Sequence, residues 1–480
     1  MGKRDGSHGS GAFWRWFPVA LVLALLAGAG AAYQFDLGAR WFGTGEPDPA
    51  TDPAAVPPPQ GVSLPAIAAP AAVAEPLTSA PRASAANVRT AVAPYLNDRD
   101  LGRRVHAVVA DLDGGRPALS VGSDPAMPAS TTKLLTTTAV LDALGPDHTF
   151  ETTVRRDGPR GIVLVGGGDP FLARKPSGGG AWPARADIVT LAKETARALA
   201  GQDRQPVRLA YDDSLFSGPA ENPHWRADYV PDGVVSPITA LWVDEGRAAS
   251  GFGRVADPAA TAAEEFAAAL SRAGIRVVGT PAPGRARPDA RQLAGVTSAP
   301  LSQIAERVIE VSDNEGAEVL ARHVGLATAD EGSSAAGVSG IVDTLDRLGV
   351  RVAGAEVYDG SGLSRDNRID PDTLVDVLRV ASSDEHPDLR ATITGLPVAG
   401  FTGSLTYRFA DTPVPGRGRV RAKTGTLTGV SSLAGVVTDL DGVPMAFAIM
   451  ADRVRLPNTL DAREAADDFA AALGSCHCAR

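Results

Sequence analysis

Cysteine is nearly absent from this chain of 480 residues. The two cysteines, Cys476 and Cys478, stand in the last five positions and flank His477. No disulfide framework is therefore expected to hold the fold together. The Cys-His-Cys tail carries metal-ligand residue types and an oxidisable pair, and we interpret it as a solvated chain end. We expect neither a metal nor a cofactor.

A surplus of positive charge is also absent. The formal net charge at pH 7 is −10, and no basic cluster interleaved with aromatic residues occurs, which excludes a nucleic-acid partner. Lysine itself is scarce, because only five of the 46 basic residues are lysines. A desolvated lysine can lose its proton near neutral pH, whereas an arginine in practice cannot. A lysine inside a motif of this chain therefore points to chemistry that arginine does not supply.

Long apolar runs are missing except for one, from Phe17 to Tyr33, which follows Lys3, Arg4 and Arg15. We interpret residues 1–33 as a signal peptide or a membrane anchor. Seventeen residues are few for a membrane span and many for a cleaved signal, so both alternatives stay open. The positive residues in front of the run predict an extracytoplasmic protein in either case, anchored in the membrane by this segment or secreted into the cell envelope.

Residues 34–87 are rich in proline and alanine, with ten prolines between positions 45 and 82. Such a composition cannot build a hydrophobic core and favours an extended chain. We predict a disordered linker that holds the folded part of the protein away from the membrane.

The first motif is Ser130-Thr131-Thr132-Lys133. It is predicted to begin an apolar helix that runs to Leu144 and stops at Gly145-Pro146. Residues three apart share one face of a helix, so the Lys133 amine would lie near the Ser130 hydroxyl as a base beside a nucleophile. The alternative is that Ser130 only caps the helix, since this pattern is loose on its own.

The second motif is Ser312-Asp313-Asn314, between helices predicted at 300–310 and 315–324. Ser312 and Asn314 alternate across a short turn, so both side chains can point into one cleft. There a hydroxyl can pass on a proton and a carboxamide can hold a peptide group. A plain helix cap is the alternative reading of this motif.

The third motif is Lys423-Thr424-Gly425-Thr426, which precedes strands predicted at 431–440 and 443–451. Asp-Gly at 441–442 joins these two strands as a hairpin. Lys423 would then stand on an edge strand, and Gly425 would let the backbone approach a ligand closely.

The rest of the chain carries fewer signals. Strands are predicted at 105–112 and 118–121, directly before the Ser130 helix. The region 146–295 reads as mixed, with a strand at 161–165 and helices near 184–199 and 261–273. It shows no catalytic group of its own apart from the loop Gly166–Pro170, where a plain turn is the first interpretation and a substrate-facing Asp169 the second.

The order of the three motifs is typical of penicillin-binding proteins and class A β-lactamases. Within that group the chain resembles the D-Ala-D-Ala carboxypeptidases of the penicillin-binding protein 4 type (DacB, peptidase family S13) over about residues 88 to 474. The long interval between Ser130 and Ser312 supports this narrower resemblance. So do the sequences at 168–170, 359–364 and 423–430.

The resemblance implies an α+β fold of the serine β-lactamase/penicillin-binding transpeptidase type. A five-stranded antiparallel sheet flanked by helices would form a discontinuous catalytic domain from residues 88–145 and 296–480. Residues 146–295 would be a large mixed α/β insertion.

The resemblance also implies a serine-type D-Ala-D-Ala carboxypeptidase, and with the same cleft an endopeptidase, acting on peptidoglycan stem peptides. Ser130 would attack the carbonyl of the penultimate D-Ala while Lys133, made neutral by burial and by the nearby Lys423 charge, acts as base. Ser312 would relay the proton to the leaving group and Asn314 would hold the peptide.

Further roles follow from the same resemblance. Lys423, Thr424 and Thr426 would receive the terminal carboxylate, with Gly425 between them. Backbone N–H groups of Ser130 and Thr426 would form the oxyanion hole. Asp169 is a candidate contact for the side chain of the third stem residue. β-Lactams are expected to acylate Ser130 and remain bound.

Three alternatives remain. A serine β-lactamase needs a fast deacylating base, and no Glu-x-x-Leu-Asn occurs between Asn314 and Lys423. A non-catalytic envelope-binding module would not need an intact nucleophile and base. A His-dependent hydrolase is disfavoured because the histidines are scattered and no serine stands in a Gly-x-Ser-x-Gly sequence.

Overall fold

The computed structural model describes residues 81–122, 124–200, 206–409 and 416–479. The predicted signal or anchor at 1–33 and most of the predicted linker at 34–87 lie outside these residues. Helix α3 (Ala85–Leu96) begins two residues before the predicted end of the linker, and the Ser84 side chain caps it. In the described part of the chain, no helix is both long and apolar enough to cross a membrane.

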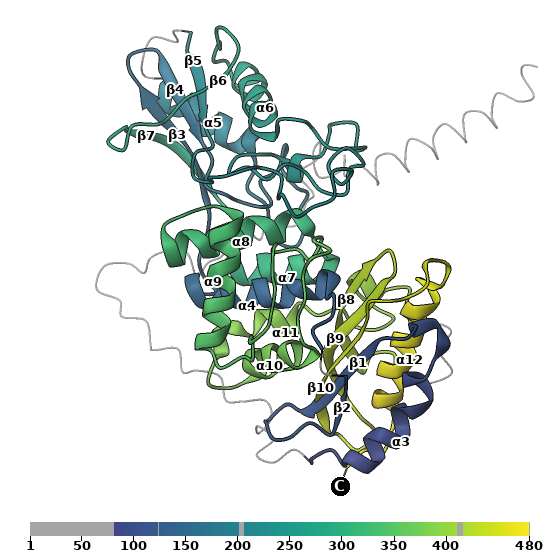
Figure 1. Cartoon of the computed structure of the whole chain (residues 1–480). Helices are drawn as coiled ribbons and strands as arrows, with labels where there is room; N and C mark the ends of the chain where they lie inside the picture. Colours follow the sequence, from purple (N-terminus) through teal and green to yellow (C-terminus); the bar gives the residue numbers. More distant parts are fainter. Residues whose placement is uncertain (1–80, 123, 201–205, 410–415, 480) are drawn as a thin grey trace, which may run out of the picture. The chain divides into compact units, whose positions relative to one another are not determined.

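The first sheet has five antiparallel strands in the order β2-β1-β10-β9-β8 (Figure 1). Its strands are β1 (Val105–Asp111), β2 (Leu119–Val121), β8 (Val420–Leu427), β9 (Val430–Thr438) and β10 (Pro444–Ala451). Strand β1, from the start of the described chain, pairs along its whole length with β10, near its end. The predicted five-stranded antiparallel sheet is confirmed, with β8 at its edge.

The β9–β10 hairpin forms where the Asp-Gly pair predicted it. The turn is two residues longer at the β9 end than expected, because Asp439 Oδ1 accepts hydrogen bonds from the backbone N–H groups of Asp441 and Val443. Gly442 has a φ of 82°, a left-handed conformation that a glycine adopts without steric cost.

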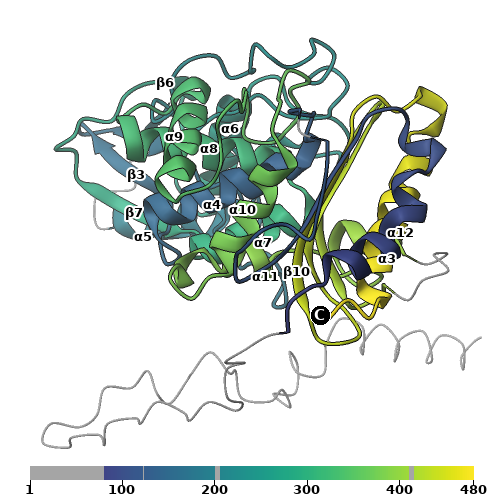
Figure 2. The same ribbon diagram turned by 60° about the horizontal axis from the view of Figure 1, so that its bottom comes forward.

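Helices α3 and α12 (Asp461–Ser475) lie side by side on one face of the first sheet (Figure 2). Buried side chains between these helices and the strands include Val88, Val92, Phe447, Ile449 and Phe469. Alternate residues of β10 point to this face, as the two-residue period of a strand requires.

The opposite face of the sheet is covered by a larger group of helices. They are α4 (Lys133–Leu144), α7 (Leu301–Val311), α8 (Asn314–Ala329), α9 (Ser334–Arg347), α10 (Pro371–Ser382) and the short α11 (Ala391–Thr394). Helix α4 runs through the middle of a core that contains Leu134, Leu135, Val308 and Leu320. It ends at Gly145, as predicted, whereas α8 runs five residues beyond its predicted end.

A second sheet of five strands, in the order β6-β5-β4-β3-β7, is formed by residues between α4 and α7. Its strands are β3 (Glu151–Asp157), β4 (Gly161–Val165), β5 (Arg208–Asp212), β6 (Ala282–Pro283) and β7 (Gln292–Thr297). The sheet is mixed, because β4–β5 and β5–β6 pair in parallel and the other pairs are antiparallel. Helices α5 (Ile188–Leu199) and α6 (Pro258–Arg272) pack on it.

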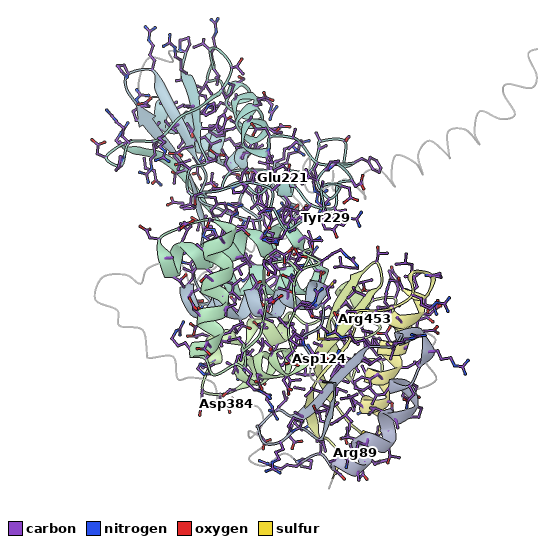
Figure 3. All side chains as sticks on the ribbon, in the orientation of Figure 1. Arg89, Asp124, Glu221, Tyr229, Asp384 and Arg453 are labelled. Atoms are coloured by element: carbon purple, nitrogen blue, oxygen red, sulfur yellow. A yellow bond between two sulfur atoms is a disulfide. The ribbon has the colours of Figure 1, made fainter. Side chains whose placement is uncertain are left out.

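A long segment without α-helix or strand connects β5 to α6 and carries Glu221 and Tyr229 (Figure 3). Short 3₁₀ turns complete the described elements: Arg99–Leu101, Ala129–Thr132, Asp244–Gly246, Pro387–Leu389, Gly403–Leu405 and Leu456–Asn458.

The C-terminal tail is folded, so our interpretation of a solvated chain end is wrong. Cys476 and Cys478 form a disulfide, and Cys478 is fully buried against the core beneath α3 and α12. The Cys478 N–H donates to Asp439 Oδ2 at 2.8 Å, and the Cys478 carbonyl accepts from Ser84 N at 2.7 Å. Ala479 and Ala83 form an antiparallel bridge.

Candidate active site

Ser130 lies in the 3₁₀ turn Ala129–Thr132, which leads directly into α4. The preceding Ala129 has a φ of 48°, a strained conformation for a residue with a Cβ. The backbone of Gly362 packs against the Ala129 carbonyl so closely that a Cβ at position 362 would collide with it. This packing fixes the half-buried Ser130 at the start of the helix.

Lys133 is fully buried, and its three ammonium protons have three acceptors. Nζ donates to Ser130 Oγ at 3.1 Å, to Asn314 Oδ1 at 2.8 Å and to the Ser361 carbonyl at 2.6 Å. All three acceptors are uncharged, so none of them holds the lysine in its charged form as a carboxylate in contact would.

Burial lowers the pKa of Lys133 from its usual 10.5 to about 8. The strongest surrounding charges, the carboxylates of Asp359 and Asp313, act in the opposite direction and limit the shift. Lys423 is also fully buried, and burial together with repulsion from Lys133 lowers its pKa well below the usual value. Removal of an ammonium from water is the dominant cause at both lysines.

Ser312 ends α7 in a left-handed conformation, with a φ of 59°. Lys423 Nζ donates to Ser312 Oγ at 2.8 Å and to the Thr424 carbonyl at 2.8 Å. The middle residue, Asp313, caps α8 by accepting a hydrogen bond from Gly316 N at 2.7 Å. The capping interpretation therefore holds for Asp313, while Ser312 and Asn314 on either side of it contact the two lysines.

Strand β8 presents the third motif at the edge of the first sheet. The Thr424 hydroxyl is hydrogen-bonded to Ser404 Oγ at 3.0 Å, and Thr426 is exposed. A Cβ at Gly425 would collide with Ser432 Oγ and the Pro128 carbonyl. The glycine thus lets β8 approach the backbone before Ser130, whereas the sequence had suggested approach to a ligand.

The structure brings together the five residues predicted to carry the chemistry: Ser130, Lys133, Ser312, Asn314 and Lys423. Hydrogen bonds join Ser130 to Lys133, Lys133 to Asn314, and Lys423 to Ser312. Three motifs that are far apart in the sequence therefore form one cluster between the sheet edge and the helices.

Asp169 is not among the residues that line the pocket beside Ser312, although its neighbour Phe171 is. Its carboxylate accepts a hydrogen bond from Phe171 N, and its carbonyl accepts one from Trp242 Nε1. Burial raises the pKa of Asp169 to about 7. These contacts give Asp169 a role in holding the loop after β4.

Ser361 is the main residue that the sequence analysis missed, because its carbonyl completes the set of acceptors around Lys133. It belongs to a turn held by Asp359, whose carboxylate accepts from the N–H groups of Gly362 and Ser364. Glu318 on α8 accepts from Ser361 N. The small and polar residues at 359–364 signal a tight turn, but nothing in their sequence says that a carbonyl faces Lys133.

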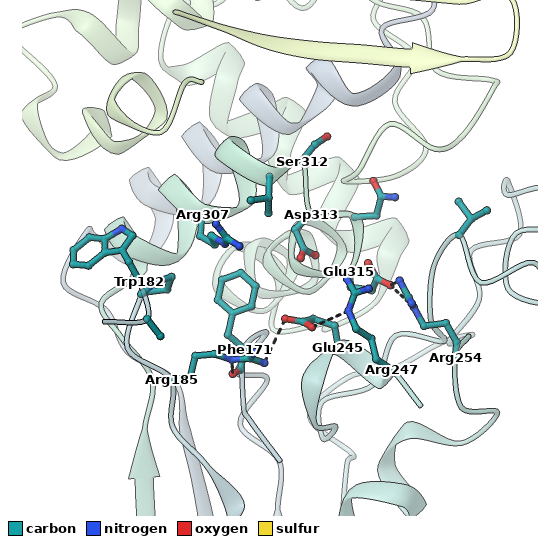
Figure 4. Close-up of a pocket in the computed structure, with 15 residues that line it drawn as sticks. Phe171, Trp182, Arg185, Glu245, Arg247, Arg254, Arg307, Ser312, Asp313 and Glu315 are labelled. Atoms are coloured by element: carbon teal, nitrogen blue, oxygen red, sulfur yellow. Dashed lines mark hydrogen bonds and ion pairs between the residues drawn. The ribbon is translucent and has the colours of Figure 1, made fainter. Parts of the chain in front are cut away.

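A pocket of about 640 Å³ opens beside Ser312 and Asn314 (Figure 4). Its wall combines the ends of α7 and α8 with residues from the region 146–295, among them Arg185, Glu245 and Arg254. The region 146–295, in which the sequence shows no catalytic group apart from the loop 166–170, therefore lines a pocket next to Ser312 and Asn314.

In the described part of the chain, one group has the residue types and spacing of a metal site: Asp439, Cys476 and Cys478. The disulfide uses both sulfur atoms, so the group does not offer thiolate ligands in this state. The cluster of Ser130, Lys133, Ser312, Asn314 and Lys423 consists of hydroxyl, amine and carboxamide groups.

A serine beside a neutralisable lysine, at the edge of an antiparallel sheet covered by helices, defines the class of serine acyl-transfer enzymes with the penicillin-binding fold. The fold itself is similar to the crystal structure of penicillin binding protein 4 (dacB) from Haemophilus influenzae. The TM-score is 0.64 at 21% sequence identity, over 79% of this chain and 98% of that one.

Comparison of sequences identifies the family. The model of the D-Ala-D-Ala carboxypeptidase 3 (S13) family matches residues 88–251 and 248–473. The chain is 36% identical to carboxypeptidase Rv3627c of Mycobacterium tuberculosis, over 82% of this chain and 85% of that protein. It is 35% identical to carboxypeptidase DacB of Mycolicibacterium smegmatis, over 81% and 84%. The chain belongs to the D-Ala-D-Ala carboxypeptidase 3 (S13) family, as the resemblance of its motifs predicted.

Proposed function

We propose that this chain is a serine-type D-Ala-D-Ala carboxypeptidase that cleaves peptidoglycan stem peptides through an acyl-enzyme on Ser130. The observation that carries the proposal is the 3.1 Å contact between Lys133 Nζ and Ser130 Oγ. Membership of the S13 family supports it, as do relatives named D-alanyl-D-alanine carboxypeptidase, such as that of Actinomadura at 30% identity.

The surroundings of Lys133 suit a general base. A neutral amine has two N–H donors and one lone pair. Asn314 Oδ1 and the Ser361 carbonyl accept the two N–H bonds, which directs the lone pair to the Ser130 hydroxyl. With a pKa of about 8, about one Lys133 in ten is neutral at pH 7 and can take the proton of Ser130.

The remaining steps use the other two motifs. Ser130 Oγ bonds to the carbonyl carbon of the penultimate D-Ala, the amide C–N bond breaks, and Ser312 relays a proton to the leaving amine. Backbone N–H groups of Ser130 and Thr426 stabilise the oxyanion, at about 3–4 kcal/mol for each donor in comparable enzymes. The Lys423 amine, which donates to the Thr424 carbonyl, and the hydroxyls of Thr424 and Thr426 receive the terminal carboxylate by hydrogen bonding, and water then releases the acyl group.

The division of the chain follows from this proposal. Residues 88–145 and 296–480 form the catalytic domain, and residues 146–295 are an insertion that contributes one wall of the neighbouring pocket. Peptidoglycan lies outside the cytoplasm, so the protein acts there, with residues 1–33 as a cleaved signal or as an anchor. Asp169, whose carboxylate accepts a hydrogen bond from Phe171 N, stays a candidate contact for the third stem residue.

A labelled penicillin tests the function directly. The native protein should take up one label per chain, and peptide mapping should place it on Ser130. Ser130→Ala should abolish labelling, whereas Ser120→Ala, on the exposed side of β2, should leave it intact. Label on another residue, or no label on native protein, would reject the proposal.

The same sample distinguishes the carboxypeptidase from a β-lactamase. A carboxypeptidase should keep the penicillin adduct for minutes or longer and should not turn over nitrocefin. Sustained nitrocefin hydrolysis would favour the β-lactamase instead.

A further inference from the structure

The turn that contains Ser361 sets the position of one acceptor of the catalytic base, because its carbonyl accepts from Lys133 Nζ at 2.6 Å. Two helices hold this turn. Thr136 on α4 donates to the Gly360 carbonyl at 2.7 Å, and Glu318 on α8 accepts from Ser361 N at 2.8 Å. The direction in which Lys133 points its N–H bonds therefore depends on how firmly the turn is fixed.

A fully buried carboxylate, that of Asp359, lies at the centre of the turn. Its two oxygens accept five hydrogen bonds. Four of the donors belong to the turn itself: Ser361 Oγ, Gly362 N, Ser364 N and Asn367 Nδ2. The fifth donor is Trp225 Nε1, at 3.0 Å from Oδ2, and it comes from the region 146–295. A buried carboxylate needs such donors in place of water, so Trp225 contributes to holding Asp359 charged in the core.

Neighbours of Trp225 in the segment between β5 and α6 contact the same turn. Asn222 Nδ2 donates to the Tyr358 carbonyl at 2.8 Å. The ring of His224 lies 4.3 Å from that of Tyr358, and its Nδ1 is 3.1 Å from Asp366 Oδ2. The region 146–295 therefore holds the turn in addition to α4 and α8.

Charged groups face Lys133 from the turn, from α8 and from β8. Burial lowers the pKa of Lys133, and four carboxyl groups oppose this shift, in descending order those of Asp359, Asp313, Glu318 and Glu315. The cations of this surrounding are Lys423, Arg254, which pairs with Glu315, and Arg322, which acts on Glu318. Asp359 has the strongest effect of the four carboxyl groups, so the balance of its charge matters most to the base.

The indole N–H of Trp225 has two effects on the base. Its positive end faces Asp359 Oδ2 and offsets part of the negative charge that favours the ammonium form of Lys133. It also ties the turn, and with it the Ser361 carbonyl, to a second part of the chain. Loss of this donor would make the proton of Lys133 harder to remove and the lone pair of the neutral amine less well directed.

We propose that Trp225 is a positioning residue for the catalytic base Lys133. It acts through Asp359, whose carboxylate fixes the Ser361 carbonyl and supplies the strongest negative charge beside the base. The inference rests on the proposed function, and it gives the region 146–295 a part in the proton transfer. The reaction steps themselves stay as described.

The test is Trp225→Phe, which keeps an aromatic ring in place and removes only the indole N–H. Stopped-flow measurement of penicillin acylation between pH 6 and pH 10 gives the pH profile of the base. The midpoint, near pH 8 in the native protein, should rise by about half a pH unit, so the rate at pH 6 to 7 should fall about threefold. The plateau at high pH should change less. A residue with a merely structural role would lower the stability without moving the midpoint.

The matched control is Trp242→Phe. Trp242 is also buried, and its Nε1 donates to the Asp169 carbonyl at 3.1 Å. Both indole rings pack in one hydrophobic cluster with Leu363 of the turn. The control thus removes an indole hydrogen bond from the same cluster without touching Asp359, and it should keep the native midpoint.

The native protein offers a second readout that needs no change at position 225. The chain has six tryptophans, and substitution of the other five assigns the indole ¹⁵N–¹H signal of Trp225. This signal should shift with pH at the same midpoint as the acylation rate, because its acceptor Asp359 lies beside the titrating base. A signal that stays constant from pH 6 to pH 10 would overturn the inference.

The outcomes separate the two proposals. An absence of penicillin label on Ser130 in the native protein rejects the proposed function, and the role of Trp225 with it. Normal labelling together with an unchanged midpoint in Trp225→Phe, or with an equal rise in Trp242→Phe, overturns the positioning role alone. Thermal unfolding shows whether each variant is folded, and if Trp225→Phe is not, the indole titration decides.

Discussion

The catalytic cluster and the wall of the neighbouring pocket handle buried positive charge in opposite ways. In the described residues, Lys133 and Lys423 are fully buried and form no ion pair; their contacts are hydroxyl, carboxamide and carbonyl oxygens. The arginines of the pocket wall lie against carboxylates. The clearest pair is Arg254 and Glu315, at 2.7 Å with 10% and 3% of their side chains exposed.

This difference distinguishes buried charges that can react from buried charges that stabilise the structure. A buried amine without a counter-ion can release its proton, and the cost of burying it appears as a lowered pKa. A buried guanidinium with a carboxylate keeps its charge and gains its stability from that partner. The contacts of the first cluster suit proton transfer, whereas the ion pairs of the second hold the pocket wall in shape. The following experiments test this contrast, from the largest expected effect to the smallest.

Replacement of the base should have the largest effect. Lys133→Arg keeps a cation in place but cannot give up the proton, so the rate of penicillin acylation should fall by about 10³- to 10⁴-fold. Stopped-flow measurement of acylation gives the rate. Lys193→Arg, at an exposed lysine on α5, is the matched control and should behave as the native protein. Normal acylation of Lys133→Arg would remove Lys133 as the base.

Removal of one partner of an ion pair in the pocket wall should lower the stability of the protein rather than the rate of acylation. Arg254→Met leaves Glu315 buried without its counter-ion, and we expect the free energy of unfolding to fall by about 3 kcal/mol. Urea denaturation measures the change. Arg272→Met, at an exposed arginine near the end of α6, should change stability by less than about 0.5 kcal/mol. Equal effects of the two substitutions would show that the ion pair contributes little.

The pH dependence of acylation should follow the titration of Lys133. Its folded pKa of about 8 means that the neutral, active form grows about tenfold per pH unit below 8 and saturates above it. The acylation rate should therefore rise roughly fiftyfold from pH 6 to pH 8, about double again above pH 8 and then level off. Arg307→Gln, on the pocket wall, should keep the same midpoint. A flat profile between pH 6 and pH 9 would contradict a titrating Lys133.

The smallest expected effect is a gain in stability. Lys423→Met removes a buried ammonium that has no carboxylate partner, so unfolding should cost about 1 kcal/mol more, while penicillin acylation is lost. Lys193→Met serves as the exposed control and should leave both unchanged. Destabilisation by Lys423→Met would mean that the hydrogen bonds to Ser312 and the Thr424 carbonyl outweigh the burial of the charge.

The sequence predicted what depends on local spacing. Ser130 and Lys133 are neighbours because they are three residues apart at the start of a helix, and Gly145 ends that helix by adopting a positive φ. The Asp-Gly pair at 441–442 forms the turn of a hairpin for equally local reasons. Resemblance of the ordered motifs to a known family then predicted which distant segments meet.

Contacts that no local sequence pattern encodes could not be predicted from the sequence. The carbonyl of Ser361 reaches Lys133 across more than 200 positions, and any residue has a carbonyl, so composition gives no cue. Three arginines of the pocket wall, Arg185, Arg247 and Arg254, come from loops whose path depends on how the region of the second sheet folds. The C-terminal tail looked solvated because it is short and polar, yet Asp439 and Ser84 hold its backbone.

The bridge between Ala83 and Ala479 places the entry to α3 against the C-terminal tail. A partner domain fused behind the tail would therefore emerge where the preceding segment enters the fold, on the side of the sheet away from Ser130. Joining these two points with a short linker would give a circularly permuted enzyme, with new ends in an exposed loop and the reactive serine untouched.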